Sequence, residues 1–258
     1  AILADPARRG ALVRTLVGLA SHPGYVGLDL DFESFAYDPR HRSGLADQLA
    51  RAYPRLIAQT CRALHAIRRV CEVAVMARTS AAHRYDHGDI PSWVYDYRAL
   101  AAAADRVQIM AYDDHSPGGP AGPIAPLPWV RRVIAYARAT APADRFELGI
   151  PAYGYDWSGR TSATAVYAGQ LASLAASVHA RPHWDPVEGE ETFRYRVGRA
   201  RHTVWVVTAP ADAARARLAR ASGFAGVAVW AAGYGEPQLF PALLSRPRVR
   251  RPRSAPER

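Results

Sequence analysis

The sequence predicts an α/β protein in which a parallel sheet is covered by helices. Short apolar runs alternate along the chain with longer stretches whose apolar residues recur at helical spacing. Most of the short runs are apolar on both faces, which is typical of strands that have helices on both sides of their sheet. A chain of 258 residues is long enough for one such domain, or at most two small ones.

The expected elements follow one another in a regular order until about residue 151. Helical spacing predicts helices at residues 1–20, 43–69, 96–104 and 127–140. Continuous apolar runs predict strands at residues 25–31, 71–77, 107–112 and 146–151. Near the end of the chain, a last unit consists of a helix at 211–221, a strand at 226–230 and a helix at 237–244.

One region interrupts this alternation. Residues 166–179 read as a small helix, and two aromatic stretches with alternating polarity, 192–197 and 202–207, read as a hairpin. We therefore expect an α+β insertion between a strand and its return helix. The expected organisation is a main unit at residues 1–157, the insertion at 158–208, the last βα unit at 209–245 and a basic disordered tail at 246–258.

The charge balance favours an anionic partner. The chain has 33 basic residues against 23 acidic ones, a formal net charge of +10, and every basic residue is arginine. This arginine content, with abundant alanine, is typical of GC-rich bacterial genomes. We expect no nucleic-acid partner, because the basic residues do not cluster in a known module, and no membrane span, because no apolar run is long enough.

Neither cysteines nor histidines point to a metal or a cofactor. Cys61 and Cys71 form no disulfide framework and lack zinc-site spacing, so they read as small buried residues. His83 and His87 flank Asp86, but no third ligand is apparent. The motifs that bind nucleotides or form a serine nucleophile elbow are also absent from the sequence.

The sharpest chemical signal is the acidic segment Gly27–Glu33. In a strand, Asp29, Asp31 and Glu33 project from one face while the intervening apolar residues project from the other. Carboxylates this close cannot all ionise cheaply, so one should hold a proton near neutral pH, as a general acid must. A half-exposed strand with an acidic face is the structural alternative. A calcium loop is excluded because leucine and phenylalanine separate the acids.

Four segments together resemble family 18 glycoside hydrolases, the chitinases and their relatives. Val26–Glu33, which reads VGLDLDFE, resembles the signature DGxDxDxE of that family. Met110–Asp113 (MAYD), residues 148–155 (LGIPAYGY) and Gly226–Trp230 (GVAVW) resemble three later strand ends, in the family's order. Residues 120–130 and 154–157 look closest to the bacterial cell-wall and spore-cortex branch of peptidoglycan hydrolases.

This resemblance implies a (β/α)8 barrel of the TIM type, with its site at the carboxyl ends of the strands. The family signature lies on the fourth barrel strand, whereas only a helix precedes it in this sequence. We therefore expect an incomplete barrel of about five βα units that lacks the first three strands, and a missing N-terminal segment in a longer protein. Val26 also replaces the first aspartate of the signature, which would remove the outermost member of a proton relay.

The resemblance also implies a retaining mechanism in which the substrate's own acetamide oxygen attacks the anomeric carbon. Glu33 would be the general acid and then the base for water. Asp31 would orient the acetamide and stabilise the cyclic cation, and Asp29 would exchange a proton or hydrogen bond with Asp31. Tyr112 would bind the acetamide oxygen, and Asp113 would support the sugar.

Aromatic residues complete the expected site. The resemblance implies that Trp230 forms the floor beneath the sugar at the cleavage site, although Trp230 and Tyr112 could also be core aromatics. Tyr153, Tyr155 and Trp157 could line a sugar cleft or only cap the barrel. His115 reads as a loop or orienting residue.

The leading functional hypothesis is a glycosidase that cleaves β-1,4 bonds next to N-acetylglucosamine in peptidoglycan or chitin, with no metal or cofactor. The basic surface favours the anionic cell wall as the source of substrate and a secreted or wall-associated location in a bacterium. A catalytically silent carbohydrate-binding relative and an inactive truncated fragment remain as alternatives. Endo or exo action, oligomeric state and the role of the insertion stay open.

Overall fold

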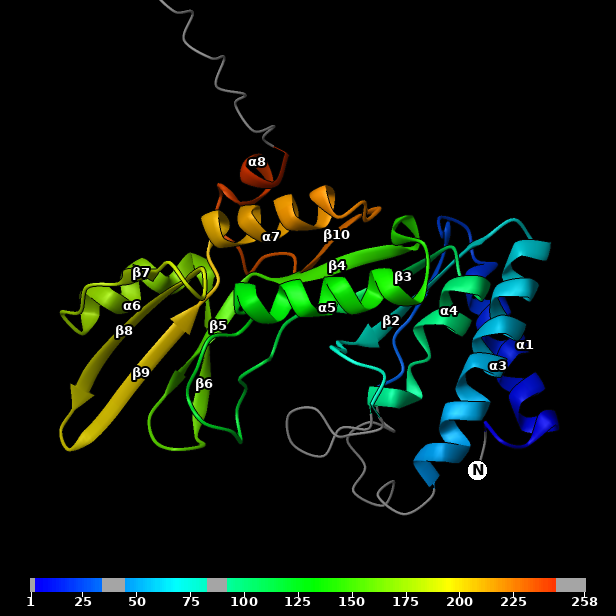
Figure 1. Cartoon of the computed structure of the whole chain (residues 1–258), viewed down its shortest axis with the longest axis horizontal. Coiled ribbons are helices and arrows are strands. Elements are labelled where there is room, and N and C mark those ends of the chain that lie inside the picture. Colours follow the sequence, from blue (N-terminus) through cyan, green and yellow to red (C-terminus); the bar gives the residue numbers. More distant parts are fainter. Residues whose placement is uncertain (1–2, 34–44, 83–91, 245–258) are drawn as a thin grey trace, which may run out of the picture.

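The computed structural model describes residues 3–33, 45–82 and 92–244, and it contains a parallel and an antiparallel sheet (Figure 1). The parallel sheet has the spatial order β1 (Gly27–Leu30), β2 (Val70–Met76), β3 (Arg106–Met110), β4 (Phe146–Pro151) and β10 (Gly226–Trp230). The helices around it are α1 (Pro6–Ala20), α3 (Leu45–Ala66), α4 (Tyr97–Ala103), α5 (Leu127–Thr140), α7 (Ala209–Ala221) and α8 (Leu239–Leu244). These elements confirm the α/β prediction.

Helices that connect successive strands, or that precede the last one, pack on this sheet. In the described ranges, α3 packs on β2, α4 on β3, and α7 on both β4 and β10. Asp5 caps α1 by accepting hydrogen bonds from the backbone N–H groups of Ala7 and Arg8 at 2.8 and 3.1 Å. The middle strands are largely buried, with Val73, Val75 and Ile109 fully so. Burial on both faces is the reason that these strands read as continuous apolar runs.

The predicted strands and helices of the parallel unit are present, with small shifts at their ends. The predictions for α5, β4 and β10 agree with the structure at both ends. The helix expected at residues 96–104 begins one residue later, because Asp96 is its N-cap and accepts a hydrogen bond from the N–H of Ala99. The tail at 246–258 and the group His83, Asp86 and His87 lie outside the described residues. No described helix is long and apolar enough to span a membrane.

The antiparallel sheet lies beside the carboxyl end of β4 (Figure 1). Its strands, in spatial order, are β6 (Ala163–Tyr167), β5 (Tyr153–Trp157), β9 (Ala200–Val206), β8 (Glu190–Val197) and β7 (His183–Asp185). One face packs against α6 (Leu171–Ser177) through a small apolar cluster that includes Phe193 and Val204. The hairpin prediction for β8 and β9 is confirmed.

The helix expected at residues 166–179 is wrong in its first part. Residues up to Tyr167 form β6, which pairs with β5, and a 3-10 turn (Ala168–Gln170) separates it from α6. Apolar spacing alone could not distinguish the two, because antiparallel pairing with the preceding strand, β5, decides the conformation of β6. Two further 3-10 turns, Ser92–Val94 and Ala143–Arg145, precede α4 and β4.

A buried ion pair fastens the antiparallel sheet to the parallel unit. Glu190 of β8 accepts hydrogen bonds from the N–H groups of Ile124 and Ala125 at 2.9 and 2.7 Å. Its carboxylate also lies 3.0 Å from Arg215 of α7, and both side chains are fully buried. Arg215 donates further hydrogen bonds to the carbonyl oxygens of Ala125, Gly189 and Ala211. These partners offset part of the cost of removing both charges from water, because burial still raises the pKa of Glu190 and lowers that of Arg215.

The prediction that Cys61 and Cys71 are simply small buried residues outside any disulfide is wrong about the disulfide. Cys61, near the end of α3, and Cys71, at the start of β2, form a disulfide whose Cα atoms lie 5.1 Å apart. Both residues are buried, as expected. The pair was not apparent from the sequence because the two residues belong to different elements. The packing of α3 on β2 brings them together.

The Glu190–Arg215 pair leads to a stability prediction. Arg215→Leu leaves the buried Glu190 carboxylate without its countercharge, so we expect the free energy of unfolding to fall by about 3–5 kcal/mol. Urea unfolding followed by circular dichroism measures this loss. Arg217→Leu, at an exposed position of the same helix, is the matched control and should change little. Similar losses in the two variants would contradict this account of the pair.

Candidate active site

Three carboxyl groups lie where the chain leaves β1. Asp29 belongs to the strand, and Asp31 and Glu33 follow it on the same face. Phe32 projects to the opposite face and packs edge-on against the ring of Tyr53, with centroids 6.4 Å apart. The structure therefore brings together the three acidic residues that the sequence singled out.

Two of these carboxyl groups, Asp29 and Asp31, retain a proton more readily than isolated ones do. Asp31 keeps one side open to water, yet desolvation by nearby protein atoms, followed by the charges of Glu33 and Asp29, raises its pKa to about 6. Desolvation and then the charge of Glu72 also raise the pKa of Asp29.

Asp113 lies after the end of β3 and accepts two hydrogen bonds from tyrosines of β5. The hydroxyl groups of Tyr153 and Tyr155 donate to its Oδ1 atom at 2.9 and 3.0 Å. Burial raises the pKa of Asp113, the two hydrogen bonds lower it, and the charge of Glu33 raises it, with a net increase. The backbone of Asp113 has a φ of 61°, an uncommon conformation for a residue other than glycine. The antiparallel sheet thus fixes the orientation of an acid that the parallel sheet carries.

Asp31, Glu33 and Asp113 line the same cavity, which has a volume of about 150 Å³. Its walls come from the carboxyl ends of four of the parallel strands, β1, β2, β3 and β10, and from the start of β5: they are formed by Asp31, Glu33, Met76, Met110, Tyr112, Asp113, Tyr153 and Trp230. Trp230 is 51% exposed at the end of β10, so its ring is available to a ligand. Six of the nine predicted site residues line this cavity.

The remaining three predicted residues lie around the cavity without lining it. Asp29 lies in β1, two residues before Asp31. Tyr155 is linked to the site by the hydrogen bond from its hydroxyl to Asp113. Trp157 is 1% exposed and packs edge-on against Tyr155, with centroids 5.5 Å apart. Trp157 is therefore a support for Tyr155. His115, in the following loop, lies 3.0 Å from the carbonyl oxygen of Pro123 through its Nδ1 atom.

Sequence reasoning missed Met76 and Met110 as lining residues. Both are the last residues of their strands, β2 and β3, and this position was the available signal. Gly149 of β4 has a related function, because a Cβ atom there would lie 2.6 Å from the carbonyl oxygen of Ile109 and 3.1 Å from the Tyr112 ring. The absence of a side chain lets β3 and β4 approach and leaves room for Tyr112.

Acidic side chains beside an exposed aromatic ring, at the carboxyl ends of parallel strands, are the kind of site that glycosidases use. Comparison with known proteins agrees: the model of Glycosyl hydrolases family 18 matches residues 1–235, and the chain belongs to this family. Among the residues that the structure describes, no group of three or more His, Cys, Asp or Glu side chains could hold a metal ion.

Two proteins with similar sequences come from Bacillus subtilis. The chain is 30% identical to an uncharacterized glycosylase, YvbX, of Bacillus subtilis, over 88% of this chain and 63% of the relative. It is 28% identical to a cortical fragment-lytic enzyme of the same species, over 92% of this chain and 53% of that enzyme. The chain thus spans between half and two thirds of the length of these two relatives.

Solved structures of chitinases and cortex-lytic enzymes have a similar fold. A chitinase from Chromobacterium violaceum superposes with a TM-score of 0.81 at 31% identity, covering 92% of this chain and 71% of that one. The spore cortex-lytic enzyme SleL of Bacillus megaterium superposes with a TM-score of 0.77 at 25% identity, covering 94% and 54%. The five parallel strands of this chain are therefore part of a TIM-type barrel, as predicted.

The raised pKa of Asp31 leads to a prediction about stability. Between the ordinary value of 3.8 and about 6, folded Asp31 holds a proton that the unfolded chain has released. Its contribution to the free energy of unfolding therefore falls as the pH rises through this window. Asp31→Asn should remove that part of the fall, which urea unfolding measured across the window would detect.

The control for this experiment is Asp144→Asn, at an exposed carboxyl before β4. Its stability should follow the wild-type pH dependence, because Asp144 lies away from the acidic cluster. Curves for Asp31→Asn that run parallel to wild type through the same window would show that Asp31 titrates normally.

Proposed function

We propose that this chain hydrolyses β-1,4 bonds next to N-acetylglucosamine in peptidoglycan, with retention and with the substrate's acetamide as nucleophile. The observation that carries the proposal is the cavity that brings Asp31, Glu33 and Asp113 together with the exposed ring of Trp230. Neighbouring carboxyl groups in one site can supply an acid for the first step and an anion that stabilises the cation formed in it.

In the first step, Glu33 donates its proton to the glycosidic oxygen as the bond from that oxygen to the anomeric carbon breaks. The acetamide oxygen of the same sugar bonds to the anomeric carbon and forms a cyclic oxazolinium ion. Asp31, now ionised, stabilises this cation and orients its nitrogen, while Asp29 adjusts the proton affinity of Asp31 through its charge. In the second step, the Glu33 carboxylate takes a proton from the water that attacks the anomeric carbon, while the bond from that carbon to the acetamide oxygen breaks and the acetamide is restored.

The tyrosines and Asp113 position the reacting sugar. Tyr112 lines the cavity and is assigned the hydrogen bond to the acetamide oxygen. Tyr153 and Tyr155 hold Asp113 in an orientation in which its carboxyl can accept a hydrogen bond from a hydroxyl group of the sugar. Trp230 offers its exposed ring as a stacking surface.

The valine that replaces the first signature aspartate is compatible with this assignment. Val26 precedes β1 and is 77% exposed, while Glu33 follows the opposite end of the strand. Seven residues of extended chain span roughly 23 Å, so the substitution leaves the acids at the cavity unaffected.

Peptidoglycan is favoured over chitin as the substrate. The net charge of +10 attracts an anionic polymer, whereas chitin is uncharged. The similarity to a cortical fragment-lytic enzyme supports the same choice.

Removing the proposed acid tests the assignment. We expect Glu33→Gln to lower kcat by about 10²–10⁴-fold, because the amide cannot donate the proton. The assay is hydrolysis of purified peptidoglycan and of N-acetylglucosamine oligomers, with products identified by mass spectrometry.

The matched control is Asp144→Asn, which removes one charge near the amino end of β4 and should retain activity. Full activity in Glu33→Gln would refute the role of Glu33. Sugar binding without hydrolysis by the wild-type chain would instead favour the carbohydrate-binding alternative, and neither binding nor hydrolysis would favour an inactive fragment.

A further inference from the structure

The hairpin of the antiparallel sheet carries a concentration of positive charge that the proposed chemistry does not use. Arg194 and Arg196 lie on β8, and Arg201 lies on β9; we call these three residues the arginine stripe. All three side chains are exposed, and none forms an ion pair with a carboxylate in the described part of the chain. A hollow of about 680 Å³ beside the hairpin is lined by all three arginines and also by groups on the other side of the strands, including Tyr195, His202 and residues 178–180.

The register of the hairpin places two of these charges directly opposite each other. Arg196 pairs with Arg201 across the two strands, and Arg194 pairs with Thr203. Like charges at directly opposite positions destabilise a strand pair. An anionic ligand that binds both guanidinium groups would remove this repulsion.

The stripe shares a face of the sheet with the tyrosines of the active site. Residues paired across antiparallel strands project to the same side, and alternate residues do as well. Thr192, two residues before Arg194, pairs with Trp205, and Trp205 pairs with Tyr155. Arg194 therefore projects on the same side as Tyr155, whose hydroxyl binds Asp113.

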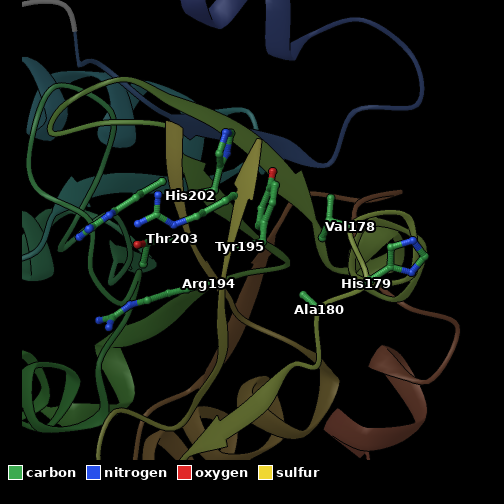
Figure 2. A pocket seen from close by; sticks show the side chains of 9 residues that line it. Val178, His179, Ala180, Arg194, Tyr195, His202 and Thr203 are labelled. Carbon is green, nitrogen blue, oxygen red and sulfur yellow. The ribbon is translucent and has the colours of Figure 1, made fainter. Parts of the chain in front are cut away.

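The opposite face of the hairpin is occupied by other contacts. There, Tyr195 and His202 stack with centroids 4.4 Å apart, and both hydrogen-bond to Asp156 of β5. Figure 2 shows Arg194 extending away from Tyr195 and from Val178 at the end of α6. The Asp156 contacts tie the hairpin to β5, so the arginines are held on a rigid element.

The arginine stripe begins close to Tyr155, one of the tyrosines that bind Asp113. With about 3.3 Å per residue along a strand and about 4.8 Å between strands, Arg194 and Arg196 lie about 12 and about 16 Å from Tyr155. A polysaccharide that places one sugar over Trp230 and extends across this sheet would bring its own substituents to the stripe.

We propose that the arginine stripe binds the carboxylates of the peptide side chains attached to the glycan of peptidoglycan. This inference rests on the proposed function and adds a basis for choosing peptidoglycan over chitin, which has no carboxylates. Guanidinium groups bind carboxylates through paired hydrogen bonds and stay charged at any relevant pH. Because the peptides are covalently part of the substrate, each contact adds to the binding of the glycan itself.

The test compares the triple variant Arg194→Gln/Arg196→Gln/Arg201→Gln with a matched triple variant on α5, Arg131→Gln/Arg132→Gln/Arg138→Gln. The α5 arginines are also exposed, so both variants lose the same charge. Calorimetry, performed in the Glu33→Gln background to prevent turnover, gives Kd for three probes. These are peptide-bearing glycan fragments, the same fragments with amidated carboxylates, and N-acetylglucosamine oligomers.

We expect the stripe variant to weaken binding of the peptide-bearing fragments by about tenfold and to leave the other two probes unchanged. The α5 variant should bind all three as its parent does. Replacing the three stripe residues by lysine should restore part of the loss, and added salt should reduce the difference. Unchanged melting temperatures would show that the fold is intact.

Equal losses for all three probes, or no loss for the peptide-bearing fragments, would overturn the proposal. So would a loss confined to a phosphate-bearing wall polymer, which would identify another ligand. Hydrolysis of the three probes by the chain that retains Glu33 is measured separately. If no probe is cleaved, the proposed function fails, while the dependence of Kd on the carboxylates still decides whether the stripe binds them.

Discussion

Parallel strand pairing is the constraint on which the site depends. Because all five strands of the main sheet run in one direction, their carboxyl ends meet at one edge, and the last residues of separate segments share a cavity. Glu33, Asp113 and Trp230 are far apart in sequence and become neighbours only through this pairing. Within β1, the alternation of side chains separates acids from the apolar residues that anchor the strand in the core.

The antiparallel sheet contributes to the site because a buried ion pair holds it in place. Glu190 and Arg215 connect β8 to α7 and to the loop before α5. The same sheet presents Tyr153 and Tyr155 to Asp113. The sheet is therefore a structural part of the proposed sugar site, and its outer hairpin carries the arginine stripe on the same face.

Local pattern predicted the elements that have a regular period. The apolar runs gave the five parallel strands, and the acidic segment gave the carboxyl cluster, because both depend on side chains a few residues apart. Contacts between separate elements, even elements close in sequence, were not predictable in this way. The Cys61–Cys71 disulfide, the strand conformation of β6 and the burial of Trp157 beneath Tyr155 all result from tertiary packing.

The configuration of the first-formed product tests the proposed mechanism most directly. Proton NMR can record the anomer released from a short N-acetylglucosamine-containing glycan before mutarotation, in parallel with the same glycan after removal of its acetyl groups. If the acetamide is the nucleophile assisted by Asp31 and Glu33, the β anomer appears first and the deacetylated glycan is not cleaved. Release of the α anomer, or equal cleavage of the deacetylated glycan, would contradict the mechanism.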